Sequence, residues 1–280
     1  MGIAAKLRAR LQQSEIVVAP GVYDALSAYR ADTAGFEAVF VSGSALAATH
    51  LARPDIGLLT ASETAEIVAR IADRIAVPMF VDADQGFGNQ FSVARTVRAL
   101  ERAGAAAIQI EDQQEVKPAA KPLSRPLIAS EAMVDKIRAA RDCLHDSETI
   151  ISARSDAMST EGFERALDRA HAYADAGADM IFVESLTTRD QMERLVSEMG
   201  GKVPLLHNLL RADDEVTDAQ TVEAIGFSVA LFPGTALAAV GAALDDGFAK
   251  LISTPRLDMA GSAVDRVGAA EYLNQRKRPS

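Results

Sequence analysis

The chain has 280 residues, 49% of them hydrophobic, and a formal net charge of −10 at pH 7. This length and composition predict a large buried core, in one α/β barrel or in two smaller domains. The acidic balance argues against nucleic acid or an anionic membrane surface as a partner. The one cysteine, Cys143, excludes an internal disulfide, and we find no segment typical of a membrane span or a signal peptide. We therefore expect a cytoplasmic protein.

Helical patterns alternate with short apolar runs along the whole chain. At four places a glycine ends the helical pattern and an apolar run follows, which is typical of a helix cap leading into a parallel strand covered on both faces. Four further apolar runs lie between these. The expected strands are 16–19, 38–43, 79–82, 107–112, 149–153, 180–185, 203–207 and 228–233. The expected helices lie near 22–34, 62–75, 91–103, 131–144, 162–176, 188–199, 217–225 and 233–249.

Eight strand–helix units in about 250 residues predict a closed (β/α)8 TIM barrel. An open, doubly wound sheet is the alternative, but eight evenly spaced parallel strands favour closure. We expect a single domain over residues 1–280. Its barrel core is predicted at about 15–250, with a C-terminal helical extension at 251–280.

The third expected strand ends in two carboxylates spaced two residues apart, Asp82 and Asp84. On a strand this spacing places both side chains on one face, where they repel unless a positive group lies between them. The next strand ends in Glu111, a third candidate. A hard divalent cation such as Mg²⁺ prefers oxygen ligands and keeps several waters. The pattern therefore indicates a metal site, although ordinary strand-end salt bridges would give the same sequence.

Chemistry in a TIM barrel takes place at the carboxyl ends of the strands, and polar residues follow most of the expected strands here. These residues are Ser42, Gly43, Ser44, Asp82, Asp84, Glu111, Arg154, Glu184, His207 and Asn208. They indicate a barrel mouth lined for a metal and a small anionic ligand. Arg154 requires an anionic partner, either a neighbouring carboxylate or a substrate carboxylate.

A long polar segment, Gln113 to Pro126, follows the strand that ends in Glu111. It contains three prolines and three basic residues, among them Lys117. A loop of this length at a barrel mouth is typical of a lid over the site. A plain connector is the alternative.

Five short motifs together make the chain resemble the isocitrate lyase / phosphoenolpyruvate mutase superfamily, from about Pro20 to Leu244. They are Ser42-Gly43-Ser44, Pro54-Asp55, Val-Asp-Ala-Asp-x-Gly-Phe-Gly-Asn at 81–89, Ile-Glu-Asp at 110–112, and Ala-Arg-Ser-Asp-Ala at 153–157. The resemblance implies a Mg²⁺-dependent barrel enzyme, with Mn²⁺ as an alternative ion, that stabilises the enolate of a 2-oxo acid.

The resemblance also implies a role for each matching residue. Asp82 would bind the metal directly, and Asp84 and Glu111 would hold its waters. Ser42, Gly43 and Ser44 would bind the substrate carboxylate, and Arg154 would reach the carboxylate or the oxo group. Asp55 would lie close by, Lys117 would be the lysine of the lid, and Glu184 and Asn208 would match polar residues of the lyase branch.

The lid departs from the pattern of the superfamily. Isocitrate and methylisocitrate lyases carry Lys-Arg-Cys-Gly-His there, with the cysteine as a proton donor, whereas this chain has Lys117-Pro118-Ala119-Ala120-Lys121. We therefore expect cleavage of a carbon–carbon bond next to a 2-oxo or 2-hydroxy acid, by a lyase or an oxaloacetate-type decarboxylase. Phosphorus–carbon chemistry by a mutase or hydrolase is an alternative, and a barrel that binds a 2-oxo acid without turning it over is another. By resemblance the chain forms a homotetramer that exchanges its last barrel helix.

Overall fold

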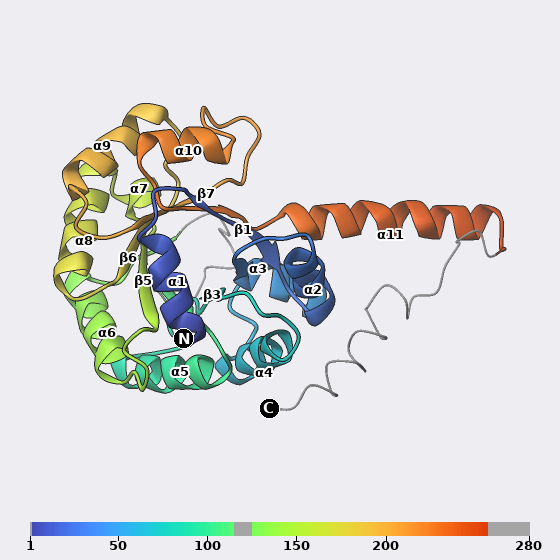
Figure 1. Cartoon of the computed structure of the whole chain (residues 1–280), viewed down its shortest axis with the longest axis horizontal. Coiled ribbons are helices and arrows are strands. Elements are labelled where there is room, and N and C mark those ends of the chain that lie inside the picture. Colours follow the sequence, from blue (N-terminus) through green and yellow to red (C-terminus); the bar gives the residue numbers. More distant parts are fainter. Residues whose placement is uncertain (1, 115–124, 257–280) are drawn as a thin grey trace. The chain divides into compact units, whose positions relative to one another are not determined.

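Eight parallel strands form a closed barrel in the order β1 to β8, which confirms the expected TIM barrel. The computed structural model describes residues 2–114 and 125–256 (Figure 1). The strands are β1 Val17–Val22, β2 Val39–Val41, β3 Met79–Asp82, β4 Ala107–Glu111, β5 Ile150–Ser155, β6 Met180–Val183, β7 Leu205–Asn208 and β8 Val229–Phe232. Each expected strand thus overlaps one observed strand.

Helices follow the strands, and those that follow β1 to β7 lie around the barrel (Figure 1). The eight expected ones are α2 Ala25–Thr33, α4 Ala61–Ala72, α5 Gln90–Arg102, α6 Ser130–Asp142, α8 Phe163–Asp175, α9 Arg189–Met199, α10 Ala219–Ile225 and α11 Thr235–Ser253. Four further elements are α1 Ile3–Leu11, α3 Gly43–Leu46, the π-helix η1 Ala47–Leu51 and α7 Ala157–Thr160. No helix in the described part of the chain is long and apolar enough to cross a bilayer.

The chain divides into two compact units, and the first, Met1–Ala236, contains the whole barrel. The second begins at Leu237, inside α11. Most of the extension predicted at 251–280 lies outside the described residues.

The amino-terminal end of the barrel is closed by α1. Ala4 and Leu7 of this helix are buried in one cluster with strand residues that include Phe80 and Phe182. Aromatic and branched side chains fill the interior of small barrels in this way. Because this end is packed with apolar side chains, a polar site is accommodated at the opposite end, where the strands lead into the loops.

The first strand is longer than the sequence predicts, because it continues through Pro20 and Gly21. The backbone of β8 comes very close at this point. A Cβ atom on Gly21 would lie 2.1 Å from the carbonyl oxygen of Pro233, so glycine is required by the packing of β1 against the end of β8.

The ring of His207 of β7 packs on Phe227, which lies between α10 and the amino end of β8, at a centroid distance of 5.5 Å. It is buried, and burial lowers the pKa of His207 to about 4. The ordinary pKa of histidine is about 6.5. At pH values between about 4 and 6.5, His207 therefore binds a proton in the unfolded chain but not in the folded chain.

Stability is therefore expected to fall as the pH is lowered from about 6.5 towards 4. The free energy of unfolding falls between pH 7 and pH 4.5, and replacing His207 by leucine should make this fall smaller by about 2 kcal/mol. Urea unfolding of both proteins at several pH values measures this difference, and identical pH profiles would contradict the assignment.

Candidate active site

The carboxyl ends of the neighbouring strands β3, β4 and β5 bring two carboxylates and a guanidinium group together. Asp82 is the last residue of β3 and Glu111 the last of β4. Arg154 of β5 lies beside Glu111 in the strand register. Asp82 and Glu111 are buried, and the Arg154 side chain is only 12% exposed. The expected acidic cluster and its basic neighbour therefore share the barrel mouth.

Two main-chain amides hold the carboxylate of Asp82. The amide of Gly43 donates to Oδ2 at 3.3 Å, and the amide of Asp84 donates to Oδ1 at 3.2 Å. A Cβ atom on Gly43 would lie 3.2 Å from Oδ2, so a larger residue would crowd the acid. The segment predicted to bind the substrate thus lies directly against the residue predicted to bind the metal.

Ser42 and Ser44 lie at the start of α3 on the same side of the mouth. Ser42 is buried, and its Oγ accepts a hydrogen bond from the amide of Ala45 at 3.5 Å, which caps the helix. Its Oγ lies 3.0 Å from that of Ser44, which is exposed. Two hydroxyls and the Gly43 amide are therefore grouped near Asp82.

The loop after β3, residues 83–88, carries Asp84 in a left-handed backbone conformation. Asp84 has φ +46° and Phe87 has φ +57°, a region that residues other than glycine rarely adopt. The amide of Glu111 donates to the carbonyl oxygen of Asp84 at 2.9 Å. This bond joins the loop to the end of β4 and places Asp84 next to Glu111.

Glu111 has an unsatisfied oxygen that suits a cation or its hydration shell. The residue is 2% exposed, and its Oε1 has no hydrogen-bond partner. Burial raises the pKa of Glu111 well above its ordinary value; Arg154 opposes this rise, and the nearby Asp156 and Asp82 add to it. A divalent cation in the cluster would relieve the repulsion and give Oε1 a partner, directly or through water. The residues present therefore fit Mg²⁺.

Within residues 2–114 and 125–256, no three His, Cys, Asp or Glu side chains form a ready-made set of direct ligands. Mg²⁺ is usually held by one or two carboxylates and keeps several waters. The geometry is thus compatible with direct binding through Asp82 and water-mediated binding through Asp84 and Glu111.

Arg154 is surrounded by carboxylates. Its Nε and Nη2 donate to Oδ2 and Oδ1 of Asp156, both at 3.0 Å, in a bidentate pair. Nε also lies 3.4 Å from Glu111 Oε2, and Nη2 lies 3.6 Å from Glu184 Oε2. Burial lowers the pKa of Arg154, but the three acids together raise it well above its ordinary value. The sequence left two kinds of partner open for Arg154, a neighbouring carboxylate and a substrate carboxylate. In the structure its partners are neighbouring carboxylates.

Asp156 was not assigned to the site from the sequence, yet it connects several parts of it. Besides Arg154, it accepts hydrogen bonds from Gln113 Nε2 at 3.1 Å and from Arg125. These cationic and hydrogen-bonding partners hold the pKa of Asp156 below its ordinary value, although burial acts in the opposite direction. The sequence signal was its spacing two residues after Arg154, the same spacing that marked Asp82 and Asp84.

The far side of the mouth is formed by Glu184 and Asn208. Asn208 Nδ2 donates to Glu184 Oε2 at 3.3 Å, and the buried Oδ1 of Asn208 has no hydrogen-bond partner. Asn208 thus keeps an acceptor for a ligand, while its amide group orients the acid beside Arg154.

Two predicted residues are not joined to the cluster by these contacts. Asp55 lies half-buried in the loop between η1 and α4. Lys117 and most of the expected lid lie outside the described residues, so their roles stay predictions.

A family model described as phosphoenolpyruvate phosphomutase matches residues 7–252. The chain belongs to this family. The resemblance inferred from the motifs is thereby confirmed.

Relatives with named activities include several lyases. The 2,3-dimethylmalate lyase of Eubacterium barkeri is 39% identical over 243 residues, which cover 83% of this chain and 80% of the relative. The 2-methylisocitrate lyase of Aeropyrum pernix is 45% identical over 231 residues, covering 82% and 73%. The chain is thus an enzyme whose relatives include carbon–carbon lyases, as the sequence predicted.

Solved structures of similar proteins share the fold of this chain. A 2,3-dimethylmalate lyase has a TM-score of 0.91 at 31% identity, over 98% of this chain and 94% of that one. An oxaloacetate acetylhydrolase bound to 3,3-difluorooxalacetate has a TM-score of 0.91 at 28% identity, over 97% and 95%. A phosphonopyruvate hydrolase in complex with oxalate and Mg²⁺ has a TM-score of 0.88 at 28% identity, over 98% of each chain.

Proposed function

We propose that the protein is a Mg²⁺-dependent enzyme that cleaves a carbon–carbon bond next to a 2-oxo or 2-hydroxy acid, through an enolate intermediate. The observation that carries this proposal is the buried acidic cluster at the barrel mouth, where Glu111 keeps an unpartnered oxygen beside Asp82 and Asp84. Mg²⁺, or Mn²⁺ in its place, would supply Lewis-acid stabilisation of the developing negative charge.

The residues of the chain divide the remaining work. Asp82 would hold the ion directly, and Asp84 and Glu111 would hold it through water. The serines and the amide around Gly43 bind the substrate carboxylate. Arg154, kept charged by its three acids, provides the positive charge that faces the substrate.

The other predicted residues have supporting roles. Glu184 orients Arg154 and Asn208 from the far side, and Asn208 offers its Oδ1 to a ligand group or a bound water. Asp55 and Lys117 complete the set by their match to the family's motifs.

The position of the cysteine favours decarboxylation within this reaction class. Cys143 is the C-cap of α6, which leads into the amino end of β5, so it lies at the opposite end of the barrel. Burial raises the pKa of its thiol, and its Sγ donates to the carbonyl oxygen of Ala140 at 3.2 Å. The thiol therefore has neither the place nor the reactivity to replace the lid acid of the lyases.

Loss of CO₂ from an oxaloacetate-like substrate does not need a lid residue that donates a proton to the leaving group. The bond between the methylene carbon and the departing carboxylate breaks, and its electron pair forms the enolate. CO₂ leaves, and water then donates a proton to the methylene carbon to give pyruvate. The chain binds the remaining carboxylate and the oxo oxygen at the barrel mouth, beside Asp82, Glu111 and Arg154.

Incubation with oxaloacetate and Mg²⁺ tests the proposal, with products followed by NMR. We expect pyruvate and CO₂ to form faster than in the protein-free Mg²⁺ control, because Mg²⁺ alone also promotes this reaction. A parallel screen of 2-oxo and 2-hydroxy dicarboxylates tests the wider lyase class. No turnover of any of these acids would overturn the proposal.

The phosphonopyruvate hydrolase neighbour gives one reason to test phosphorus–carbon chemistry as the second candidate. Phosphate released from phosphonopyruvate, or a phosphonate formed from phosphoenolpyruvate, would identify it. Mg²⁺-dependent binding of oxalate without turnover of any substrate would instead identify a binding barrel.

The proposed assembly is a cytoplasmic homotetramer. None of the α11 side chains is buried within the chain, although the helix is rich in apolar residues. Its exposed large side chains are Val240, Leu244, Phe248, Leu251 and Ile252. Exchange of this helix between subunits would cover them.

A further inference from the structure

Helix α6 carries a charged residue on the face that packs against the barrel. Its buried residues are Met133, Lys136, Ile137 and Ala140, which follow the spacing of one helical face. Three of them are apolar, whereas Lys136 places an ammonium group there and is only 6% exposed. Burial of a cation is unfavourable unless hydrogen bonds compensate for the lost water. The contacts of this ammonium group therefore indicate why a lysine occupies the position.

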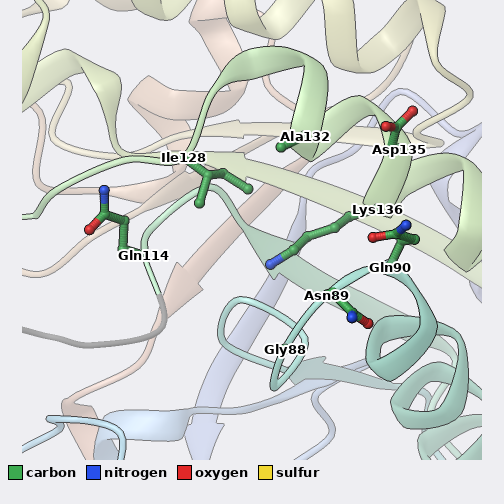
Figure 2. Close-up of a pocket in the computed structure, with 8 residues that line it drawn as sticks. All are labelled: Gly88, Asn89, Gln90, Gln114, Ile128, Ala132, Asp135 and Lys136. Atoms are coloured by element: carbon green, nitrogen blue, oxygen red, sulfur yellow. The ribbon is translucent and has the colours of Figure 1, made fainter.

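The ammonium group reaches the loop that carries Asp84. Lys136 Nζ donates to the carbonyl oxygen of Gln85 at 2.8 Å, and Gln85 is itself buried. Figure 2 shows the lysine side chain extending from α6 into a cleft whose lining includes Gly88 and Gln114. The cleft has a volume of about 460 Å³. Lys136 thus connects a barrel helix to the residue that directly follows Asp84.

The same loop is held at the next carbonyl by a second helix. Thr96 Oγ1 of α5 donates to the carbonyl oxygen of Gly86 at 3.2 Å. Gly86 has φ +82°, and a Cβ atom there would lie 2.4 Å from Cγ2 of Val93. Two side chains from two helices therefore fix consecutive carbonyl groups immediately after Asp84.

The loop needs such support because its backbone is strained. Asp84 and Phe87 both have positive φ values, and a residue other than glycine stays in that region only when its surroundings hold it there. A hydrogen bond from a charged donor is stronger than one from a neutral donor. Lys136 is thus well suited to stabilise the conformation that directs Asp84 towards Asp82 and Glu111.

We propose that Lys136 is a positioning residue of the Mg²⁺ site, which holds the 83–88 loop so that Asp84 can bind a metal-bound water. The inference rests on the proposed function, because it assigns Lys136 to the metal site proposed there. It acts through the backbone of Gln85 and does not itself touch the ion or the substrate.

The test compares Mg²⁺ binding of variants by isothermal titration calorimetry. Lys136→Met keeps the length and loses the charge, and we expect its Kd for Mg²⁺ to rise about 10- to 100-fold. Lys136→Arg keeps a cationic donor and is expected to restore most of the affinity. Thr96→Val removes the neighbouring hydrogen bond to the loop and should weaken binding in the same direction.

Arg138→Met is the matched control. Arg138 lies two residues further along α6, its side chain is 63% exposed, and the substitution removes the same charge. We expect it to bind Mg²⁺ as the wild type does. Excess Mg²⁺ should restore turnover in Lys136→Met, which a general loss of folding would not allow.

Asp82→Asn distinguishes a failure of the metal site from a failure of the positioning role. If Asp82→Asn abolishes binding while folded Lys136→Met and Thr96→Val retain the wild-type Kd, the role of Lys136 is refuted and the metal site stands. If Lys136→Met does not fold, unchanged binding in Thr96→Val is enough to refute the loop-positioning role. Unchanged binding in Asp82→Asn would overturn the metal site and the positioning role together.

Discussion

Replacing Asp82 by asparagine is expected to abolish Mg²⁺ binding and to lower turnover at least about 1000-fold, which corresponds to about 4 kcal/mol of transition-state stabilisation. Asparagine has the same size, and its single carbonyl oxygen can still accept one of the two hydrogen bonds that the amides of Gly43 and Asp84 donate to Asp82. The variant therefore removes the charge and one of these hydrogen bonds and keeps the size of the side chain. Calorimetric titration with Mg²⁺ and steady-state kinetics on the best substrate of the screen measure the two effects.

The control for this variant is Asp73→Asn. Asp73 is the exposed C-cap of α4, at the amino-terminal end of the barrel, and its replacement removes the same charge far from the mouth. Both parameters should stay at their wild-type values in this control. Normal Mg²⁺ affinity in Asp82→Asn would show that the ion, if it binds, is held elsewhere.

Replacing Arg154 by methionine is expected to lower the free energy of unfolding by about 3–5 kcal/mol at pH 7 and to reduce turnover more than about 100-fold. The substitution keeps an unbranched side chain but leaves Asp156, Glu111 and Glu184 without their shared cation. Breaking a buried ion pair from one side is costly because the remaining charges lose compensation, although Asp156 keeps other partners, Arg125 and Gln113. Urea unfolding and steady-state kinetics measure the two losses.

The loss of stability in Arg154→Met should depend on pH. In the wild type, the pKa of Asp156 is held below its ordinary value, so its contribution to stability is present above about pH 4 and is lost as the pH falls through the folded-state pKa. Without the guanidinium group, the pKa values of the carboxylates rise, and protonation relieves their repulsion. The difference between variant and wild type should therefore shrink between pH 7 and pH 5.

Arg165→Met is the comparison for this variant. Arg165 is 71% exposed and its ion pair with Asp168 spans 3.4 Å. An exposed pair of this kind contributes little, so we expect a change below about 0.5 kcal/mol. An equally small change in Arg154→Met would show that the carboxylates do not depend on the guanidinium group.

The barrel could be predicted because its signals are local. Apolar runs and the glycines that precede them, such as Gly104 before β4 and Gly177 before β6, mark strands without any knowledge of the partner strand. The short elements α3, η1 and α7 were not predicted, since a helix of one turn shows no periodicity. The length of β1 was underestimated because Pro20 and Gly21 are usually signals for a turn.

The candidate site was predictable where its residues lie at or just after the carboxyl ends of strands. Asp82 and Glu111 end their strands and Arg154 is the last but one residue of β5, and the barrel brings these strand ends together. Asp156 and Lys136 act through partners that the fold supplies. The partners of Asp156 include Gln113 and Arg125, which are distant in sequence, and Lys136 occupies a helical position that the periodicity assigns to an apolar residue. No local pattern indicates such contacts.

The most direct test of the central claim is a crystal structure of the protein grown with Mn²⁺ and oxalate, with the metal located by its anomalous scattering. We expect one strong peak at the barrel mouth, within bonding distance of Asp82 and within reach of Asp84 and Glu111 through water. A peak elsewhere, or no peak at the mouth while oxalate is bound, would contradict the proposal that this acidic cluster holds the metal.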